Sequence, residues 1–307
     1  TDLLTPEQYA RAGGLVQLAS ASQYLISPAI AGLLMASSGI TTVLTIDIAT
    51  MVLTVACMLL VWRTVKTPPR QTTTGFWADF RQGISFLRQH SGITVLMTLI
   101  TVVTFCMGFL QTLLTPMLLD LTDESTLGAV RSVAAVGMIV ASLIIGVFNM
   151  KGSHLTYITC FLAAGGVLIF FLGTTTSILA IGVLAFAFFM TLPPLNTSVE
   201  VIARSSIPNE TQGKVWGLMG LISQLGYVVA YAVSGVLADS VFNPLLREGG
   251  ALADSLGALI GVGTSRGIGF MLMIVGVLLI GMAVAIPRAR SIRSLQNNLP
   301  LTEKKGV

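Results

Sequence analysis

Two ionisable side chains, Asp47 and Arg131, lie inside long apolar segments of this chain. A charge placed in hydrocarbon is expensive, so such residues are functional candidates by default. Asp47 is a candidate for taking up and releasing a proton, and the alternative is a carboxylate that hydrogen-bonds nearby backbone near the membrane surface. Arg131 either attracts the anionic groups of a ligand or pairs with an outer acid such as Asp120.

Polar side chains that could meet a small molecule form a second group. Gln224, Tyr227 and Tyr231 are spaced by three and four residues, which predicts that they share one helix face. Aromatic rings with hydroxyl tips suit large amphipathic ligands, some of them cationic, although tyrosines also pack simply against neighbouring helices. The side chains that we expect to line a central cavity are Tyr24, Gln111, Arg131, Asn196, Gln224, Tyr227 and Tyr231.

One apolar segment combines a proline break with a charged end. Pro193 and Pro194 free backbone carbonyls and bend a helix, which is tolerated where the break faces a cavity or a hydrogen-bonding neighbour. Asn196 follows this break directly. Glu200 and Arg204 are four residues apart, so we expect an ion pair within the helix, either at an inner gate or at a solvated helix end.

The elements that must position these residues are membrane-spanning helices. The chain has 307 residues, of which 54% are hydrophobic and 10% charged, whereas a soluble domain carries about 25% charged residues. Apolar runs long enough to cross about 30 Å of hydrocarbon are continuous rather than alternating, which predicts helices and not a barrel. We place eight spans at residues 14–35, 42–62, 92–119, 127–148, 155–173, 178–199, 217–238 and 267–286. Small residues at 128, 137, 141 and 146 predict a close-packing face on the fourth.

Sequence patterns argue against enzymatic, metal and nucleotide chemistry. Cys57, Cys106 and Cys160 all lie within spans without metal-ligand spacing, and the two histidines, His90 and His154, are expected in loops. The glycine-rich run 261–267 departs from a phosphate-binding motif in its spacing and has no preceding strand. We therefore expect no catalytic residues, no metal and no cofactor. The net charge of +4 follows membrane topology and does not predict nucleic-acid binding.

The cations predict the orientation of the spans. The loops on one side contain fourteen Lys and Arg residues, whereas those on the other side contain only Arg247 and Arg266. By the positive-inside rule the cation-rich side is cytoplasmic, which places both ends of this chain in the cytoplasm. The outer loop 120–124 is acidic, as expected of a segment that is translocated.

The longest loop, residues 63–91, joins two parts of the chain. Its second half, from Phe76 to Arg88, has apolar residues at helical spacing, with the aromatics expected on one face and Asp79, Arg81 and Arg88 away from it. This pattern is typical of an amphipathic helix in the membrane interface. A partner-binding role is the alternative. We expect residues 1–62 to end one half, 92–286 to form the other, and 287–307 to be a cytoplasmic tail.

An internal repeat supports two similar halves. Residues 11–34 align with residues 214–237, so that Tyr24 corresponds to Tyr227. Same-direction repetition in a hydrophobic chain is typical of transporters built from two halves. Four spans precede the second copy and none precedes the first, so we expect this chain to be the C-terminal two-thirds of a longer protein.

Several segments resemble the major facilitator superfamily, and within it the bacterial macrolide-efflux-type drug exporters. The resemblance lies in Leu4–Leu15, Ser27–Gly32, Ile46-Asp47, Val136–Met138, Ile207–Val215 and Leu237–Leu246. The Ser27–Gly32 segment is at the place of a Gly- and Pro-rich motif of antiporters, with Gln23 and Tyr24 where the family has glycines.

The resemblance implies an all-α membrane protein with eight of twelve helices, five to twelve, present in this chain. It also implies alternating access, proton-driven export of drug-like molecules, and a monomer in the bacterial cytoplasmic membrane when helices one to four are included. Two alternatives stay open: export of a siderophore or other anionic metabolite, for which Arg131 would matter most, and a non-transporting membrane protein.

Overall fold

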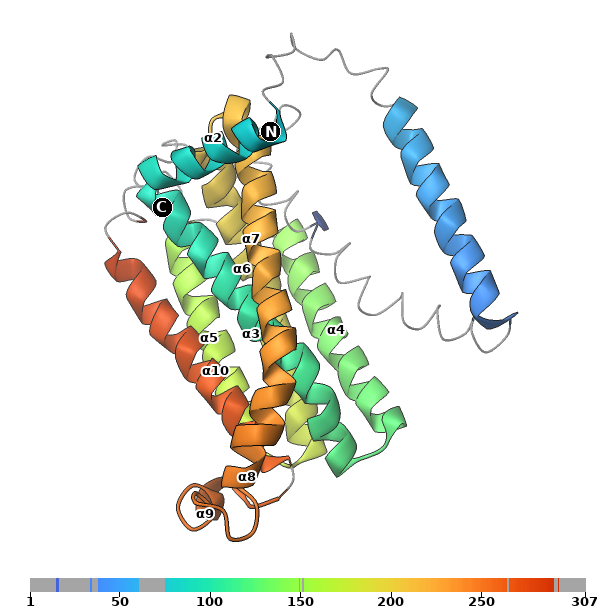
Figure 1. Ribbon diagram of the computed structural model, residues 1–307, viewed down its shortest axis with the longest axis vertical. Coiled ribbons are helices and arrows are strands. Elements are labelled where there is room, and N and C mark those ends of the chain that lie inside the picture. The colour runs from blue at the N-terminus through green and yellow to red at the C-terminus, as the bar shows by residue number, and fades with distance from the viewer. Residues whose placement is uncertain are drawn as a thin grey trace.

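The computed structural model describes residues 15–16, 34, 38–60, 75–148, 150, 152–263, 265–289 and 292. All regular elements within these residues are helices (Figure 1). After a helix at Ser38–Leu60, they are α2 (Phe76–Gln89), α3 (Ser91–Leu121), α4 (Glu124–Val147), α5 (His154–Thr174), α6 (Ile178–Ser206), α7 (Asn209–Leu237), η2 (Ala238–Phe242), α8 (Asn243–Leu245), α9 (Gly257–Ile260), α10 (Arg266–Ala285) and η3 (Ile286–Arg288).

Seven described helices are long and apolar enough to cross a membrane, and they match seven of the eight predicted spans. The predicted span 14–35 lies outside the described residues except at 15, 16 and 34. The main difference is at α7, which begins at Asn209 directly after Pro208 and continues through a π-helical turn and α8 to Leu245. Hydropathy alone missed its polar first turns, whereas Pro208 fixes the backbone angle that starts a helix.

Packing orders the six long helices α3 to α7 and α10 into an arc. α7 packs on α3, α3 on α10, α10 on α5, α5 on α6, and α6 on α4. α4 and α7, at the two ends of this arc, do not pack closely against each other, and α3 contacts both α4 and α6. One large apolar core runs through these helices.

The α5–α10 contact depends on two pairs of glycines. A Cβ on Gly166 would lie 2.8 Å from the Gly276 carbonyl oxygen, and one on Gly269 would collide with the Gly173 carbonyl oxygen. The glycines are seven residues apart on each helix, and the pairs show that the helices run antiparallel. Small residues allow backbones to approach closely, which is a main source of helix association where lipid surrounds the protein.

Helix α2 lies across one end of the bundle (Figure 1) and packs on the first turns of α7. Its buried residues Gly83 and Leu87 meet the α7 end, where a Cβ on Gly83 would lie 3.2 Å from a Leu218 methyl group. Lys214 Nζ donates a hydrogen bond to Gln82 Oε1 at 2.7 Å. The predicted amphipathic helix is therefore present and attached to α7.

Trp77 corrects one detail of that prediction. The sequence placed the aromatics on a single packed face, but Phe80 is half-buried against α7 whereas the Trp77 side chain is 73% exposed. Residue 77 is three positions before 80, so its side chain is turned toward the edge of the buried face.

The Ser38–Leu60 helix is a separate element. The bundle buries none of its most apolar window, and the helix lies apart from the bundle in Figure 1. Its exposed side chains are mostly apolar, with several threonines and Asp47 among them. A largely apolar surface suits contact with lipid or with other spanning helices.

The glycine pairs generate a stability prediction. We expect Gly173→Ala and Gly276→Ala each to destabilise the protein by about 1–3 kcal/mol, because the added methyl group forces the two backbones apart. Thermal unfolding of the purified protein in detergent measures the change.

Gly182→Ala in α6 is the matched control, because a Cβ there meets nothing within 4 Å. We expect it to be neutral or slightly stabilising. Equal melting temperatures for all three variants would contradict the proposed role of the glycine contacts.

Candidate functional site

The seam between α3 and α7 positions most of the predicted cavity residues. Thr104 Oγ1 donates a hydrogen bond to the Ser223 carbonyl oxygen at 2.7 Å, which links the two helices directly. Two glycines allow the close approach: a Cβ on Gly226 would lie 2.6 Å from the Thr101 carbonyl oxygen, and one on Gly108 would lie 2.6 Å from the Ala230 methyl group. The relative register of α3 and α7 is therefore fixed at several points.

One turn further along this seam, three of the predicted residues come together. The Tyr231 hydroxyl donates to Gln111 Oε1 at 2.9 Å, which joins α7 to α3. The Tyr227 and Tyr231 rings lie 5.8 Å apart between centroids at an interplanar angle of 35°. Tyr227 is half-buried against the core and Tyr231 is 49% exposed, so the pair presents a polar aromatic surface at the edge of the seam.

Arg131 extends this group of polar side chains to α4. Its Nη2 donates a hydrogen bond to Thr115 Oγ1 at 2.6 Å. Thr115 lies four residues after Gln111 and is therefore on the same face of α3. We call the side chains Tyr227, Tyr231, Gln111, Thr115 and Arg131 the polar row. The row runs from α7 across α3 to α4. α7 and α4 are the two ends of the arc, and α3 contacts both of them.

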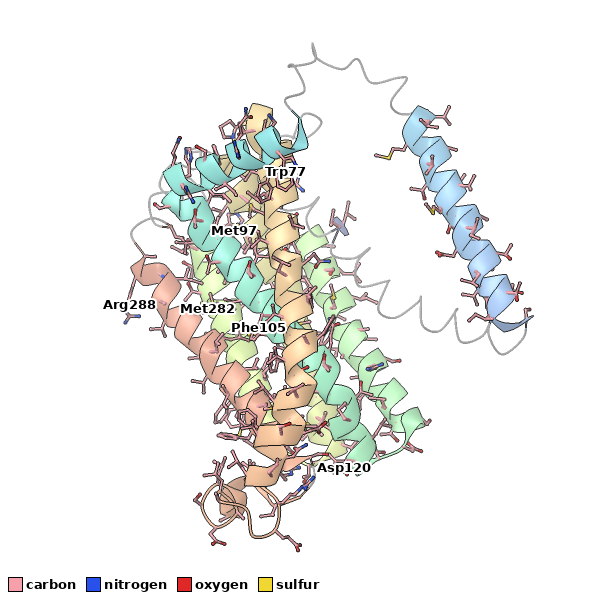
Figure 2. The ribbon with its side chains drawn as sticks, viewed as in Figure 1. Trp77, Met97, Phe105, Asp120, Met282 and Arg288 are labelled. Carbon is pink, nitrogen blue, oxygen red and sulfur yellow. The ribbon has the colours of Figure 1, made fainter. Side chains whose placement is uncertain are left out.

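The pairing suggested for Arg131 and Asp120 stays a prediction, and the structure gives each residue a further neighbour. Arg131 bonds a neutral hydroxyl, whereas Asp120 interacts electrostatically with Arg266 at the start of α10. Figure 2 shows Asp120 at the end of the bundle opposite Trp77. The hydrogen bond to Thr115 uses one of the five N–H donors of the Arg131 guanidinium.

Two other predicted cavity residues lie on helices beside the row. Gln224 is exposed on α7, two turns from Tyr231. Asn196 is half-buried on α6, beyond the proline break. That these two side chains line a cavity stays a prediction.

Glu200 and Arg204 form the predicted ion pair. Arg204 Nη2 lies 3.6 Å from Glu200 Oε2, and its guanidinium carbon lies 5.6 Å from the centre of the Trp216 ring on α7. The pair therefore also connects the last turns of α6 to the first turns of α7, near the α2 contact. Sequence reasoning missed Trp216, because the partner of a cation–π contact is set by packing and not by spacing.

Pro193 and Pro194 lie within α6, which continues through them as one helix, and Pro194 lines an apolar cavity. A cavity of about 270 Å³ is lined by Ala141, Ile144, Ile145, Phe148, Met150, Tyr157, Phe161, Met190 and Pro194. It lies between α4, α5 and α6, and its lining is apolar except for Tyr157. Pro194 faces a cavity as expected, but Asn196 is not part of that lining.

The remaining candidates lie elsewhere. Asp47 is exposed on the Ser38–Leu60 helix, and Tyr24 lies outside the described residues. His154 was expected in a loop but is buried as the first residue of α5, where Ser153 caps the helix. Among the described residues, no group of three His, Cys, Asp or Glu side chains could hold a metal ion.

Long apolar helices with a polar row confined to one side define a multi-pass integral membrane protein. The sequence profile of the Major Facilitator Superfamily matches residues 1–231. The chain therefore belongs to this superfamily of transporters, as its motifs predicted, and the described helices form part of the superfamily fold.

Two curated relatives are similar to this chain, both called "Macrolide efflux protein A", from Streptococcus pyogenes and from Streptococcus pyogenes serotype M6. Each is 25% identical over 256 residues, which is 78% of this chain and 61% of the relative. The chain thus spans less than two-thirds of their length. No solved structure matches it.

The Gln111–Tyr231 bond is testable by a double-mutant cycle. Tyr231→Phe and Gln111→Ala should each lower the free energy of unfolding. The decrease in the double variant should be smaller than the sum of the two single decreases by about 1 kcal/mol, the net contribution of one hydrogen bond. Equilibrium unfolding of the purified protein gives the three differences.

Tyr157→Phe with Gln111→Ala is the control cycle, because Tyr157 lines the separate apolar cavity. We expect those two changes to be additive. Additivity in the Tyr231 cycle as well would show that the two side chains do not stabilise each other.

Proposed function

We propose that this chain is the larger part of a secondary active transporter that exports drug-like or natural-product molecules from the cell. Family membership and the similarity to two macrolide efflux proteins support this class of function. The observation that carries the proposal is the polar row, because it gathers hydrogen-bonding and aromatic groups on three helices of a predominantly apolar bundle.

The chemistry of the row suits large amphipathic molecules. Tyr227 and Tyr231 offer ring faces and hydroxyl groups, Gln111 and Thr115 offer donors and acceptors, and Arg131 offers positive charge. Tyr24 belongs to the same proposal through the repeat, which relates it to Tyr227. Such a surface recognises shape and polarity more than one fixed functional group.

Alternating access follows in this proposal from two halves that rock about the substrate. Residues 1–62 end the first half, residues 63–91 are the linker that contains α2, residues 92–286 form the second half, and 287–307 are the tail. Glu200 and Arg204 serve as gate residues at the cytoplasmic end. Asp47 is the carboxylate that couples export to proton entry, and the complete protein works as a monomer in the bacterial cytoplasmic membrane.

Export itself is tested in cells. Cells that express the complete protein should accumulate less of a lipophilic dye or a macrolide than cells without it, and a protonophore should abolish the difference. The Gln111→Ala/Tyr231→Phe variant should export at least about tenfold less at equal membrane levels, since about 1.4 kcal/mol of binding is a factor of ten. Gly182→Ala is the matched control and should export normally.

Asp47 provides the coupling arm of the same experiment. Asp47→Asn should remove the response to an imposed pH gradient, and Asp47→Glu should retain it, because only a carboxyl group takes up and releases the proton. A full response in Asp47→Asn would exclude Asp47 as the proton-coupling residue.

Unchanged accumulation across a broad panel of compounds would refute drug export.

Export of a siderophore or another anionic metabolite is the second candidate, and the exposed guanidinium of Arg131 favours it. In that case Arg131→Gln should abolish transport of anionic substrates. Arg131→Lys should partly restore it, because lysine retains the positive charge but lacks the planar guanidinium with its paired N–H donors. Transport assays with matched anionic and neutral compounds check this. A neutral drug whose export survives Arg131→Gln would favour the first candidate.

A further inference from the structure

Helix α2 exposes a stripe of side chains beside its contact with α7. Trp77, Arg81 and Arg88 recur at intervals of four and seven residues, which places them along one side of the helix. All three side chains are exposed, and Trp77 has 73% of its surface accessible. We call these three residues the α2 stripe.

The stripe is held in a fixed direction. On the neighbouring face, Gly83 and Leu87 are buried against α7, Phe80 and Ile84 are half-buried there, and Gln82 accepts a hydrogen bond from Lys214. The helix therefore cannot roll to bury the stripe without losing this contact. Figure 2 shows Trp77 at the end of the bundle where α2 lies across the spanning helices.

The chemistry of the stripe matches the surface of a membrane. Tryptophan is enriched where hydrocarbon meets the headgroups, because its ring is apolar and its N–H is polar. Arginine binds phosphate oxygens through paired, charge-assisted hydrogen bonds. A helix that lies across the ends of spanning helices is held at this depth by the spans themselves.

We propose that the α2 stripe binds the anionic headgroups of phospholipids on the membrane surface where α2 lies, with Trp77 inserted among the lipids and Arg81 and Arg88 on their phosphates. Because α2 is attached to the first turns of α7, the lipid surface then also anchors α7, which contains Tyr227 and Tyr231 of the polar row. The proposal goes beyond the transport function and holds whatever the substrate is.

Lipid-specific quenching of Trp77 tests the proposal. The complete protein is placed in nanodiscs of phosphatidylcholine with a minor fraction of phosphatidylglycerol, and either lipid is brominated near the headgroup end of its chains. The difference between wild type and Trp77→Phe isolates the Trp77 emission. We expect brominated phosphatidylglycerol to quench it more than its bulk fraction predicts.

Charge variants separate specific binding from simple proximity. Arg81→Gln/Arg88→Gln should reduce the enrichment of the anionic lipid by about fivefold for each arginine, since each cation near an anionic surface contributes about that factor. Arg81→Lys/Arg88→Lys should retain most of it. Arg247→Gln is the matched control, because Arg247 is an exposed cation at the opposite end of the bundle, and it should change nothing.

Two results would overturn the proposal. If both brominated lipids quench Trp77 in proportion to their bulk fractions in wild type, the arginines do not select anionic lipid. If aqueous acrylamide quenches Trp77 as strongly as free tryptophan while neither brominated lipid does, the stripe faces water and is available to a soluble acidic partner instead.

Discussion

Close approach of helix backbones at glycines is the interaction on which this structure depends. Surrounding lipid is as apolar as the helices, so helix association needs tight packing and a few hydrogen bonds. Gly166 with Gly276 and Gly173 with Gly269 hold α5 to α10, and Gly108 and Gly226 hold α3 to α7. The second contact also sets the distance at which the Tyr231 hydroxyl reaches Gln111.

The two contacts have different roles. The α5–α10 contact combines glycines with apolar residues of the main core and acts as a scaffold. The α3–α7 seam combines glycines with an interhelical hydrogen bond from Thr104 and leads directly to the polar row. The row lies on α3, α4 and α7, whereas the apolar cavity beside Pro194 lies between α4, α5 and α6, so the two features share only α4.

Much of the architecture was predictable because hydrophobicity and helix length are properties of local sequence. Seven spans, the amphipathic α2 and the Glu200–Arg204 pair were confirmed, as was the shared face of Tyr227 and Tyr231, since helical spacing determines each of them. The predicted span 14–35, the role of Tyr24 and the assignment of residues 1–62 to a first half stay predictions.

Contacts between helices could not be read from spacing. Thr115 as the partner of Arg131, and Trp216 as a neighbour of Arg204, are consequences of packing across helices. The expected small-residue face of α4 shows the same limit: Gly137 meets the Phe186 backbone, whereas a Cβ on Gly128 or Gly146 would meet nothing within 4 Å. A glycine pattern indicates where helices can approach but not which positions another helix occupies.

The lengths of the helices set two groups apart, with the 24 residues of α4 between them. α3, α6 and α7 have 31, 29 and 29 residues, whereas α5 and α10 have 21 and 20. At about 1.5 Å per residue, the long helices exceed the hydrocarbon thickness of about 30 Å and can absorb a thicker or thinner bilayer by tilting. The short α5–α10 pair has no such reserve, and its glycine contacts resist a change of crossing angle. Bilayer thickness should therefore strain this rigid pair first, which makes the lipid chain length of the host membrane a determinant of how well the protein is accommodated.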